Sequence, residues 1–244
     1  MISEEINKSV LNATRIIDLI SQRDGLGISD IAKELQLPKT STFRLLKTLE
    51  VAGLLIQTNE ETYYLSYKFL TYQVGVNEDQ NLIHKCLPTI QKISEQTGET
   101  VNLTVNRLGK MYIIHSEVGE YYALQSNLAP ESELYCSSSG KIFLRYMNDE
   151  QLKNYFNRPL LARTIHTITE YEAFIPEKET ILSKGIAYDR EEYEYGLTCL
   201  SVAVLQQGQP IATIGISGPT TRLQYKNFAE IEQLLINEVA QINS

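Results

Sequence analysis

The chain has 244 residues, 43% of them hydrophobic and 21% charged, a composition that suits globular folding and a length that allows two modest domains. Its net charge of -8 and pI near 5.1 exclude a protein coated in basic charge, so contact with nucleic acid must come from a local patch. Residues 1–75 hold eight Lys and Arg against nine Asp and Glu, which leaves 14 against 21 for the remainder. The N-terminal part is therefore the less repulsive to a polyanion.

The sequence gives no sign of export, membrane insertion or metal binding. Its start, MISEEINKS, has no basic flank before an apolar core, and no stretch approaches 18 consecutive apolar residues, so we expect a cytoplasmic protein without a membrane partner. Cys86, Cys136 and Cys199 are widely scattered, which favours buried, reduced thiols. The three histidines are also dispersed and match no common zinc spacing, so we predict no metal and no cofactor.

Two helices are predicted near the N-terminus. From Lys8 to Gln22, apolar residues recur at spacings of three and four, which indicates one face of a helix: Val10, Ala13, Ile16, Ile17 and Ile20. A short second helix is predicted over residues 30–35, with Ser29 as its N-cap.

A third helix is predicted from about Lys39 to Ala52, between Pro38 and Gly53. The segment that follows, LLIQTNEETYYLSY, is rich in β-forming residues on both sides of residues 59–61, which predicts a hairpin. Three helices and a hairpin make a winged helix-turn-helix.

The third helix has two different sides on a helical wheel. One side is the apolar stripe Thr42, Leu45, Leu46, Leu49 and Ala52. The other side offers cations and hydroxyls that fit a major groove about 12 Å wide, and its start offers N–H groups to phosphate. An ordinary surface helix is the alternative, but the short helix before it and the hairpin after it favour DNA binding. The predicted DNA-binding residues are Lys39, Thr40, Ser41, Arg44, Lys47 and Thr48.

The second half of the chain mixes strands and helices. A hairpin is predicted through Val101, Leu103 and Val105, turning at residues 108–110. Further strands are expected at 121–125, 185–189, 197–205 and 211–217. Helices are expected at 82–97, 138–146, 150–156 and 227–242, with one more opened by a capping box from Thr169 to Glu172. This order describes an α+β domain built on one antiparallel sheet.

A serine cluster, SSSGK, precedes the helix expected at residues 138–146. The glycine that a phosphate-binding Walker loop needs further upstream is missing. Ser137, Ser138 and Ser139 would still place hydroxyls and backbone donors at a helix N-terminus, which suits a carboxylate. Simple capping of the helix is the alternative.

Several segments resemble the IclR family of bacterial transcriptional regulators, in the family's order and over nearly the whole chain. These are RIIDLIS, ISDIAKELQLPKTSTFRLLKTLEVAGLL, TGETVNL, SSSGKIFL, GIAYDREEYEYGLTCLSVAV and IGISGP. The resemblance implies an α+β protein with an N-terminal winged helix-turn-helix over 1–66, a linker helix over 67–80 and a GAF-like effector-binding domain over 81–244. It also implies operator binding as a homodimer or homotetramer.

The resemblance implies an effector pocket as well. Its polar lining would be Ser138, Ser139, Asp189, Cys199 and Ser217, and its apolar wall Leu124 and Leu128. Small polar residues with one carboxylate favour an oxygen-rich ligand such as a 2-keto acid or sugar acid over an aromatic one. Lys141 could attract an anion or lie in solvent. Tyr135 and Gly215 depart from residues found in many or some relatives, so the effector could differ from theirs.

We therefore predict an operator-binding regulator, most simply a repressor, whose effector changes the spacing of two winged helices. The segment from Tyr67 to Gln73 is a candidate lever and dimer contact, with plain interdomain packing as the alternative. The acidic hairpin tip at residues 59–61 supports a different interpretation, a small-molecule sensor that acts through a protein partner and binds DNA weakly. Catalysis is not expected, because Cys199 has no histidine nearby in the sequence.

Overall fold

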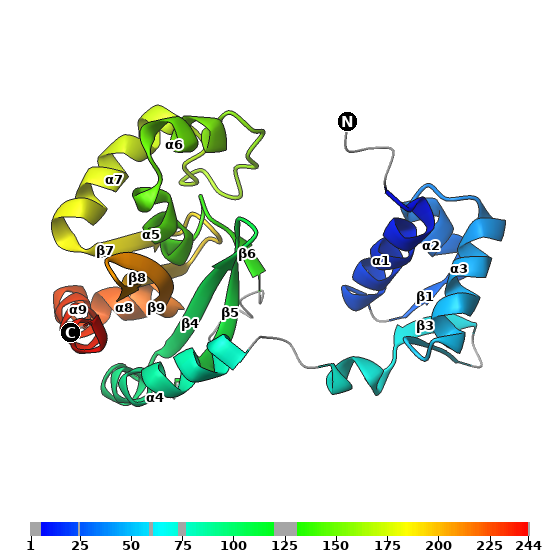
Figure 1. Ribbon diagram of the computed structural model, residues 1–244, viewed down its shortest axis with the longest axis horizontal. Coiled ribbons are helices and arrows are strands. Elements are labelled where there is room, and N and C mark those ends of the chain that lie inside the picture. Colours follow the sequence, from blue (N-terminus) through cyan, green and yellow to red (C-terminus); the bar gives the residue numbers. More distant parts are fainter. Residues whose placement is uncertain (1–5, 24, 59–60, 73–76, 120–130, 244) are drawn as a thin grey trace. The chain divides into compact units, whose positions relative to one another are not determined.

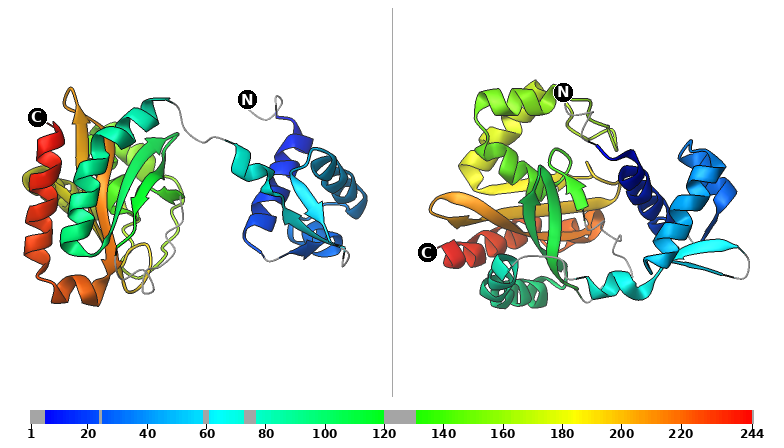
Figure 2. Two further views of the ribbon diagram at one scale, coloured as in Figure 1. Left: turned by 90° about the horizontal axis from the view of Figure 1, so that it is seen from below. Right: turned by 45° about the vertical axis from the view of Figure 1, so that its right-hand side comes forward.

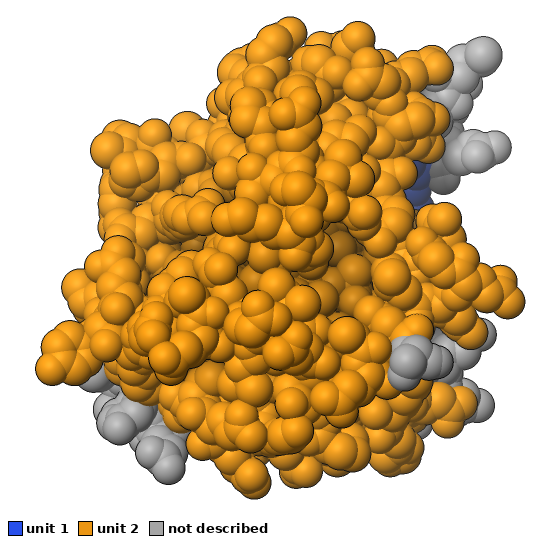
Figure 3. Space-filling view, turned by 90° about the vertical axis from the view of Figure 1, so that its left-hand side faces the viewer, with its two compact units in different colours: residues 1–74 blue, residues 75–244 orange. Residues whose placement is uncertain are grey.

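The computed structural model describes residues 6–23, 25–58, 61–72, 77–119 and 131–243. The chain divides into two compact units, residues 1–74 and 75–244, each with its own hydrophobic core. Figure 1 shows the elements of both units, and Figure 3 shows the surface of the second in orange. Among the described helices, none is long and apolar enough to cross a membrane.

The first unit is a three-helix domain with a small sheet (Figure 1). Its helices are α1 (Lys8–Ser21), α2 (Ile28–Glu34) and α3 (Lys39–Val51). The strands are β1 (Leu26–Gly27), β2 (Leu55–Gln57) and β3 (Thr62–Leu65), antiparallel in the order β1-β3-β2. A short 3₁₀ helix, η1 (Tyr67–Thr71), follows. The winged helix-turn-helix predicted from the sequence is present, with β1 as an added strand that is too short to show a pattern.

The core of the first unit forms where the helices meet β2 and β3. Its buried members are Ile16, Ile20, Ile31, Leu46, Leu49, Leu55 and Tyr63. Two residues predicted on the apolar faces are exposed. Val10 lies in the first turn of α1, before Ala13, where packing on the core begins, and Ala52 follows the end of α3. Ser29 is not the N-cap of α2; the helix begins earlier, after Gly27, without a side-chain cap.

The second unit contains one six-stranded antiparallel sheet with strand order β6-β5-β4-β9-β8-β7. The strands are β4 (Thr100–Arg107), β5 (Lys110–Glu117), β6 (Glu131–Glu133), β7 (Ile186–Arg190), β8 (Leu197–Gln206) and β9 (Gln209–Pro219). The helices are α4 (Asn77–Thr97), α5 (Ser138–Tyr146), α6 (Asp149–Phe156), α7 (Tyr171–Lys184), α8 (Thr220–Tyr225) and α9 (Phe228–Asn243). Figure 2 shows α4 and α9 on one side of the sheet.

The central strands bury both faces, and the two faces differ in chemistry. Val101, Leu200 and Ile216 are typical of the face that packs on α4 and α9, where the larger apolar cluster lies. The neighbouring positions, such as Asn102 and Ser217, point to the other face, which α5 covers. Because strand side chains alternate between faces, small polar residues are gathered beneath α5.

Several boundaries differ from those predicted. The capping box from Thr169 is absent, because α7 begins after Glu170 without a side-chain cap. The helix expected from residue 82 begins earlier, at Asn77, and β6 and α8 were not predicted. In the range expected for a linker helix, 67–80, the structure describes η1 and the start of α4, while residues 73–76 lie outside the described part. The strand expected at 121–125 also lies outside it.

Two of the motif segments meet at Glu99. Its carboxylate is fully buried and accepts hydrogen bonds from Arg222 Nε at 2.6 Å and Lys226 Nζ at 3.0 Å. A Cβ atom on Gly218 would lie 2.6 Å from Glu99 Oε2, so only glycine leaves room for the carboxylate. The GET and SGP sequences therefore serve the packing of α8 against the sheet.

Candidate functional site

The first candidate site is the outer side of α3. Thr42, Leu46 and Leu49 fix the helix by burying its inner side. Five of the six predicted DNA-binding residues are exposed on the other side: Lys39, Thr40, Ser41, Arg44 and Thr48.

The cations of α3 are not equally free. Lys47 Nζ lies 2.7 Å from Glu50 Oε2 and 3.4 Å from Gln57 Oε1, and the hydrogen bond with Glu50 raises the pKa of Lys47. Arg44, by contrast, makes no side-chain hydrogen bond or ion pair with any residue that the structure describes. Arg44 and Lys39, which is likewise exposed and unpaired among the described residues, are therefore the α3 cations free to reach a ligand such as DNA.

The second candidate site is a cavity of about 50 Å³ between the start of α5 and the polar face of the sheet. Five of the seven predicted ligand-binding residues line it: Ser138, Ser139, Asp189, Cys199 and Ser217. The other two, Leu124 and Leu128, fall outside the described residues. The ligand role of all seven stays a prediction.

Sheet register brings distant residues to this cavity. Asn102 of β4 is paired with Gly215 of β9, which is paired with Ser201 of β8. Ser217, next on the same face of β9, is paired with Cys199, which is paired with Asp189 of β7. Four strands therefore contribute side chains to one small volume.

Hydroxyl groups join α5 to the sheet across the cavity. Ser201 Oγ lies 2.7 Å from Ser138 Oγ and 3.1 Å from Ser139 Oγ. Ser137 instead caps the helix, its Oγ accepting from Gly140 N at 3.1 Å. Both interpretations of the serine cluster thus have a structural counterpart: Ser137 caps the helix, and all three serines line the cavity.

Asp189 is the acidic group of the cavity. It is 1% exposed, and its Oδ1 accepts hydrogen bonds from the backbone N–H groups of Glu192 at 2.7 Å and Tyr193 at 3.2 Å. Burial raises the pKa of Asp189 to about 7. Burial also raises the pKa of the neighbouring Cys199 thiol, which is therefore a poor nucleophile.

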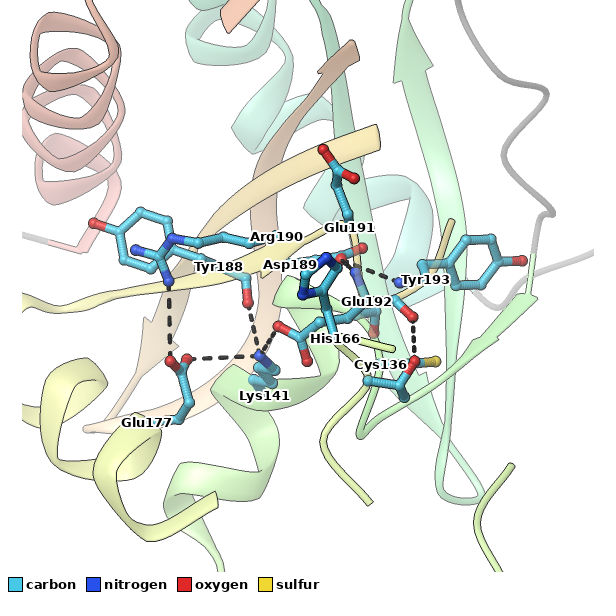
Figure 4. Close-up of polar contacts among 12 residues, drawn as sticks. Cys136, Lys141, His166, Glu177, Tyr188, Asp189, Arg190, Glu191, Glu192 and Tyr193 are labelled. Atoms are coloured by element: carbon cyan, nitrogen blue, oxygen red, sulfur yellow. Dashed lines mark hydrogen bonds and ion pairs between the residues drawn. The ribbon is translucent and has the colours of Figure 1, made fainter. Parts of the chain in front are cut away.

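Lys141 is neither an anion-attracting group in the cavity nor a solvated lysine, so both interpretations of it are wrong. It is completely buried, and Figure 4 shows its ammonium between Glu192 and Glu177. Nζ is bound by the Glu192 carboxylate, donates to Tyr188 O at 3.0 Å and lies 3.6 Å from Glu177 Oε2. The charge is used to hold α5, α7 and the end of β7 together.

The cavity has lining residues that the sequence interpretation missed. The sequence places Asn102, Thr104 and Ser201 in predicted strands without indicating that they line a pocket. A signal was present, because polar residues at alternate positions of otherwise apolar strands imply a polar face. Tyr135 does not line the cavity; its hydroxyl donates to Leu161 O at 2.7 Å. Within the described residues, no group of three or more His, Cys, Asp or Glu could hold a metal ion.

A winged helix-turn-helix followed by an α+β unit around a polar pocket defines a helix-turn-helix regulator. The chain belongs to the IclR family of bacterial transcriptional regulators. Residues 74–244 match the family model described as the bacterial transcriptional regulator IclR C-terminal, and residues 9–58 match the IclR helix-turn-helix domain. The predicted family and fold class are confirmed.

Relatives of this chain are named as regulators. It is 27% identical over 241 residues to the HTH-type transcriptional regulator KdgR of Escherichia coli, covering 97% of this chain and 91% of the relative. It is 24% identical over 243 residues to the transcriptional repressor IclR of Escherichia coli, covering 96% and 88%. These names support a regulator and not an enzyme, as predicted.

Solved structures share the fold. The IclR structure from Thermotoga maritima matches with a TM-score of 0.71 and 26% identity, covering 96% of this chain and 97% of that one. An IclR homologue from Microbacterium hydrocarbonoxydans, complexed with 4-hydroxybenzoate, matches with a TM-score of 0.77 and 18% identity, covering 97% and 98%. The second likeness concerns the fold alone.

Proposed function

We propose that this chain is a sequence-specific repressor that binds operator DNA through α3. A small acidic metabolite, such as a 2-keto acid or sugar acid, occupies the cavity of the second unit and thereby lowers or raises the affinity for the operator. The cavity carries the proposal. Packing alone would be served by apolar residues, which need no hydrogen-bond partners when they are buried. A cluster of hydroxyls around Asp189 is therefore better suited to a polar ligand than to packing.

The DNA part of the proposal depends on the outer side of α3. Arg44 is exposed and unpaired among the described residues, so it can fork onto a guanine, while Ser41 and Thr40 can reach phosphate or base edges. Because α3 offers few cations, the α3 helix of a single chain would bind DNA weakly. Two copies of the chain docking in successive major grooves, about 34 Å apart, would gain affinity through effective concentration. A homodimer or homotetramer in the cytoplasm fits this requirement.

The acidic class of the effector is supported by the N-terminus of α5. Ser138 and Ser139 of its first turn line the cavity, and hydroxyls at a helix N-terminus suit a carboxylate. The relative from Microbacterium hydrocarbonoxydans holds 4-hydroxybenzoate, which is also a carboxylate. An aromatic acid therefore belongs in any test beside keto and sugar acids.

Calorimetry with pyruvate, D-gluconate and 4-hydroxybenzoate tests the effector class. We expect at least one to bind the wild type, and Ser139→Leu to abolish that binding by filling the cavity. Footprinting on promoter fragments from the same genome tests the DNA role, with Arg44→Ala losing operator preference and keeping its fold. Protein that binds none of the acids, or a footprint unchanged in Arg44→Ala, would contradict the respective half of the proposal.

The pairing of Lys47 with Glu50 favours a second candidate, a small-molecule sensor that acts through a protein partner and binds DNA weakly. Duplex binding at low and moderate salt separates the two, because groove docking weakens steeply as salt rises. Retained binding to one promoter fragment at moderate salt supports the repressor. Weak binding that is equal for all fragments supports the sensor.

A further inference from the structure

The part of the cavity lining that the structure describes has no basic side chain. None of the described residues that line it is Lys, Arg or His, and Asp189 is its one formally charged member. Residues 120–130, EYYALQSNLAP, also contain none of these three residue types, so they cannot add a cation to it. A carboxylate effector would therefore meet a carboxylate without a side-chain cation to balance either.

The one Lys or Arg that is buried among the described residues, Lys141, does not line the cavity. Lys141 belongs to α5, whose start lines the cavity, but its Nζ is bound by the Glu192 carboxylate and by Tyr188 O at 3.0 Å. Glu177 Oε2 lies 3.6 Å from it on the opposite side (Figure 4). Two carboxylates already compensate this ammonium, and its charge lowers the pKa of Asp189 by less than burial raises it.

The two carboxylate oxygens of Asp189 differ in their hydrogen bonds. Its Oδ1 accepts two backbone N–H groups, those of Glu192 and Tyr193. Its Oδ2 has no hydrogen bond with any described residue, although Asp189 is only 1% exposed and lines the cavity. An ionised carboxylate only accepts hydrogen bonds, whereas a protonated one donates from the oxygen that carries the hydrogen.

We propose that an acidic effector enters this cavity together with one proton, which Asp189 holds on Oδ2 and donates in a hydrogen bond to an oxygen of the ligand. The inference rests on the proposed function, since it concerns the same cavity. Binding then adds one anion and one proton to the protein, so the charge within the cavity is the same before and after binding. Two carboxylates in so small a buried volume would otherwise repel each other strongly.

The surroundings of Asp189 agree with this proton uptake. Burial already raises its pKa to about 7 in the empty cavity, and a bound anion raises it further. The titratable and charged groups that act on Asp189 are Lys141, Glu192, Tyr193, Cys136 and Cys199. Glu177 acts on Lys141 and Glu192, and Arg163 lies over the ring of Tyr193. Both thiols have raised pKa values, so they stay neutral, and Lys141 is compensated as described.

Calorimetry at pH 8 in two buffers with different heats of ionisation measures the uptake directly, with pyruvate, D-gluconate and 4-hydroxybenzoate as probes. We expect about one proton per bound acid, and an affinity that is constant below about pH 6 and falls about tenfold per pH unit above pH 8. Asp189→Asn keeps the Oδ1 acceptor and cannot titrate, so it should bind the same acid without uptake and without this pH dependence. Asp149→Asn, an exposed acid of α6, is the matched control and should behave as the wild type.

The wild-type measurement stands even if a variant fails to fold. An acid that binds without proton uptake overturns this inference and leaves the proposed function intact. Equal uptake by the wild type and Asp189→Asn also overturns it, because the proton then resides elsewhere. If no acid binds at pH 6, where the proton is available, the proposed effector class fails and this inference fails with it.

Discussion

The ammonium of Lys141 is bound by the carboxylate of Glu192, and both side chains are buried, at 0% and 5% exposure. The two residues are far apart in the sequence, and their contact fixes the turn after β7 to α5. Because Glu192 N also donates to Asp189 Oδ1, this ion pair supports the acidic group of the cavity. Removing one partner leaves an uncompensated buried charge, which costs more than the pair contributes.

Lys141→Met should therefore lower the free energy of unfolding by about 3 to 5 kcal/mol, measured by urea denaturation at pH 8. Burial raises the pKa of Glu192, so the orphaned carboxyl takes up a proton more readily as the pH falls, and the loss should be smaller at pH 5. Adding Glu192→Gln to Lys141→Met should recover part of the stability. Equal stability of wild type and Lys141→Met at pH 8 would show that the Lys141–Glu192 pair does not stabilise the packing of α5 on the turn after β7.

Freeing Lys47 should strengthen DNA binding. In the free protein its Nζ lies 2.7 Å from Glu50, so that carboxylate competes with phosphate. Glu50→Gln removes the competitor and one negative charge from α3, and we expect tighter operator binding with a salt dependence steeper by about one counterion. Fluorescence anisotropy at several salt concentrations measures both quantities.

Arg44→Ala is the contrasting variant, expected to lose about 1 to 3 kcal/mol of operator discrimination with little change in stability, since its side chain is exposed. Arg23→Ala, which removes an exposed cation paired with Glu34, controls for loss of charge alone. If Glu50→Gln weakens operator binding, Lys47 contacts DNA by a different route or the glutamate itself reads a base.

Asp189 should make the stability of the second unit depend on pH. Its pKa is 3.8 ordinarily and about 7 in the fold, so the folded protein holds the proton more tightly than the unfolded chain. The resulting stabilisation is fully present below about pH 4 and is lost as the pH rises through 7. Relative to Asp189→Asn, the wild type should lose up to about 4 kcal/mol between pH 4 and pH 8 in denaturation experiments. Parallel pH profiles for the two proteins would contradict the raised pKa.

Helices were predicted well where a capping residue and helical spacing of apolar residues occur in the same segment. The helix Ser138–Tyr146 has the bounds that were expected, because Ser137 caps it and its apolar residues follow helical spacing. The predicted start of α7 was wrong because its local signal was ambiguous. A Thr-x-x-Glu pattern permits a capping box but does not require one. The helix α7 starts after Glu170, so Thr169 is not its N-cap.

Contacts between distant residues could not be read from spacing. The partners of Lys141 lie on α7 and in the turn after β7, so its burial depends on how those elements pack against α5. Asn102 and Ser201 reach the same cavity only because β4, β9 and β8 pair in one register. Five lining residues were predicted together from the resemblance to a family, because their spacing in the sequence does not show that they share a cavity.

Gly215 gives a last test of whether the hydroxyl cluster serves a ligand. A Cβ atom there would lie 2.4 Å from Ser201 Oγ, the oxygen that joins Ser138 and Ser139. Gly215→Ala should therefore displace that hydroxyl, lowering stability by about 1 to 3 kcal/mol and the affinity for an acidic effector about tenfold or more.

The double variant with Ser201→Ala distinguishes packing from ligand binding. Removing the Ser201 hydroxyl relieves the closest contact of the new methyl group, so thermal denaturation should show stability partly restored. Calorimetry should show that affinity is not restored, because the hydroxyl that holds Ser138 and Ser139 toward the ligand is gone. Recovery of both quantities together would mean that Ser201 acts through packing alone, and that the ligand contacts lie elsewhere in the cavity.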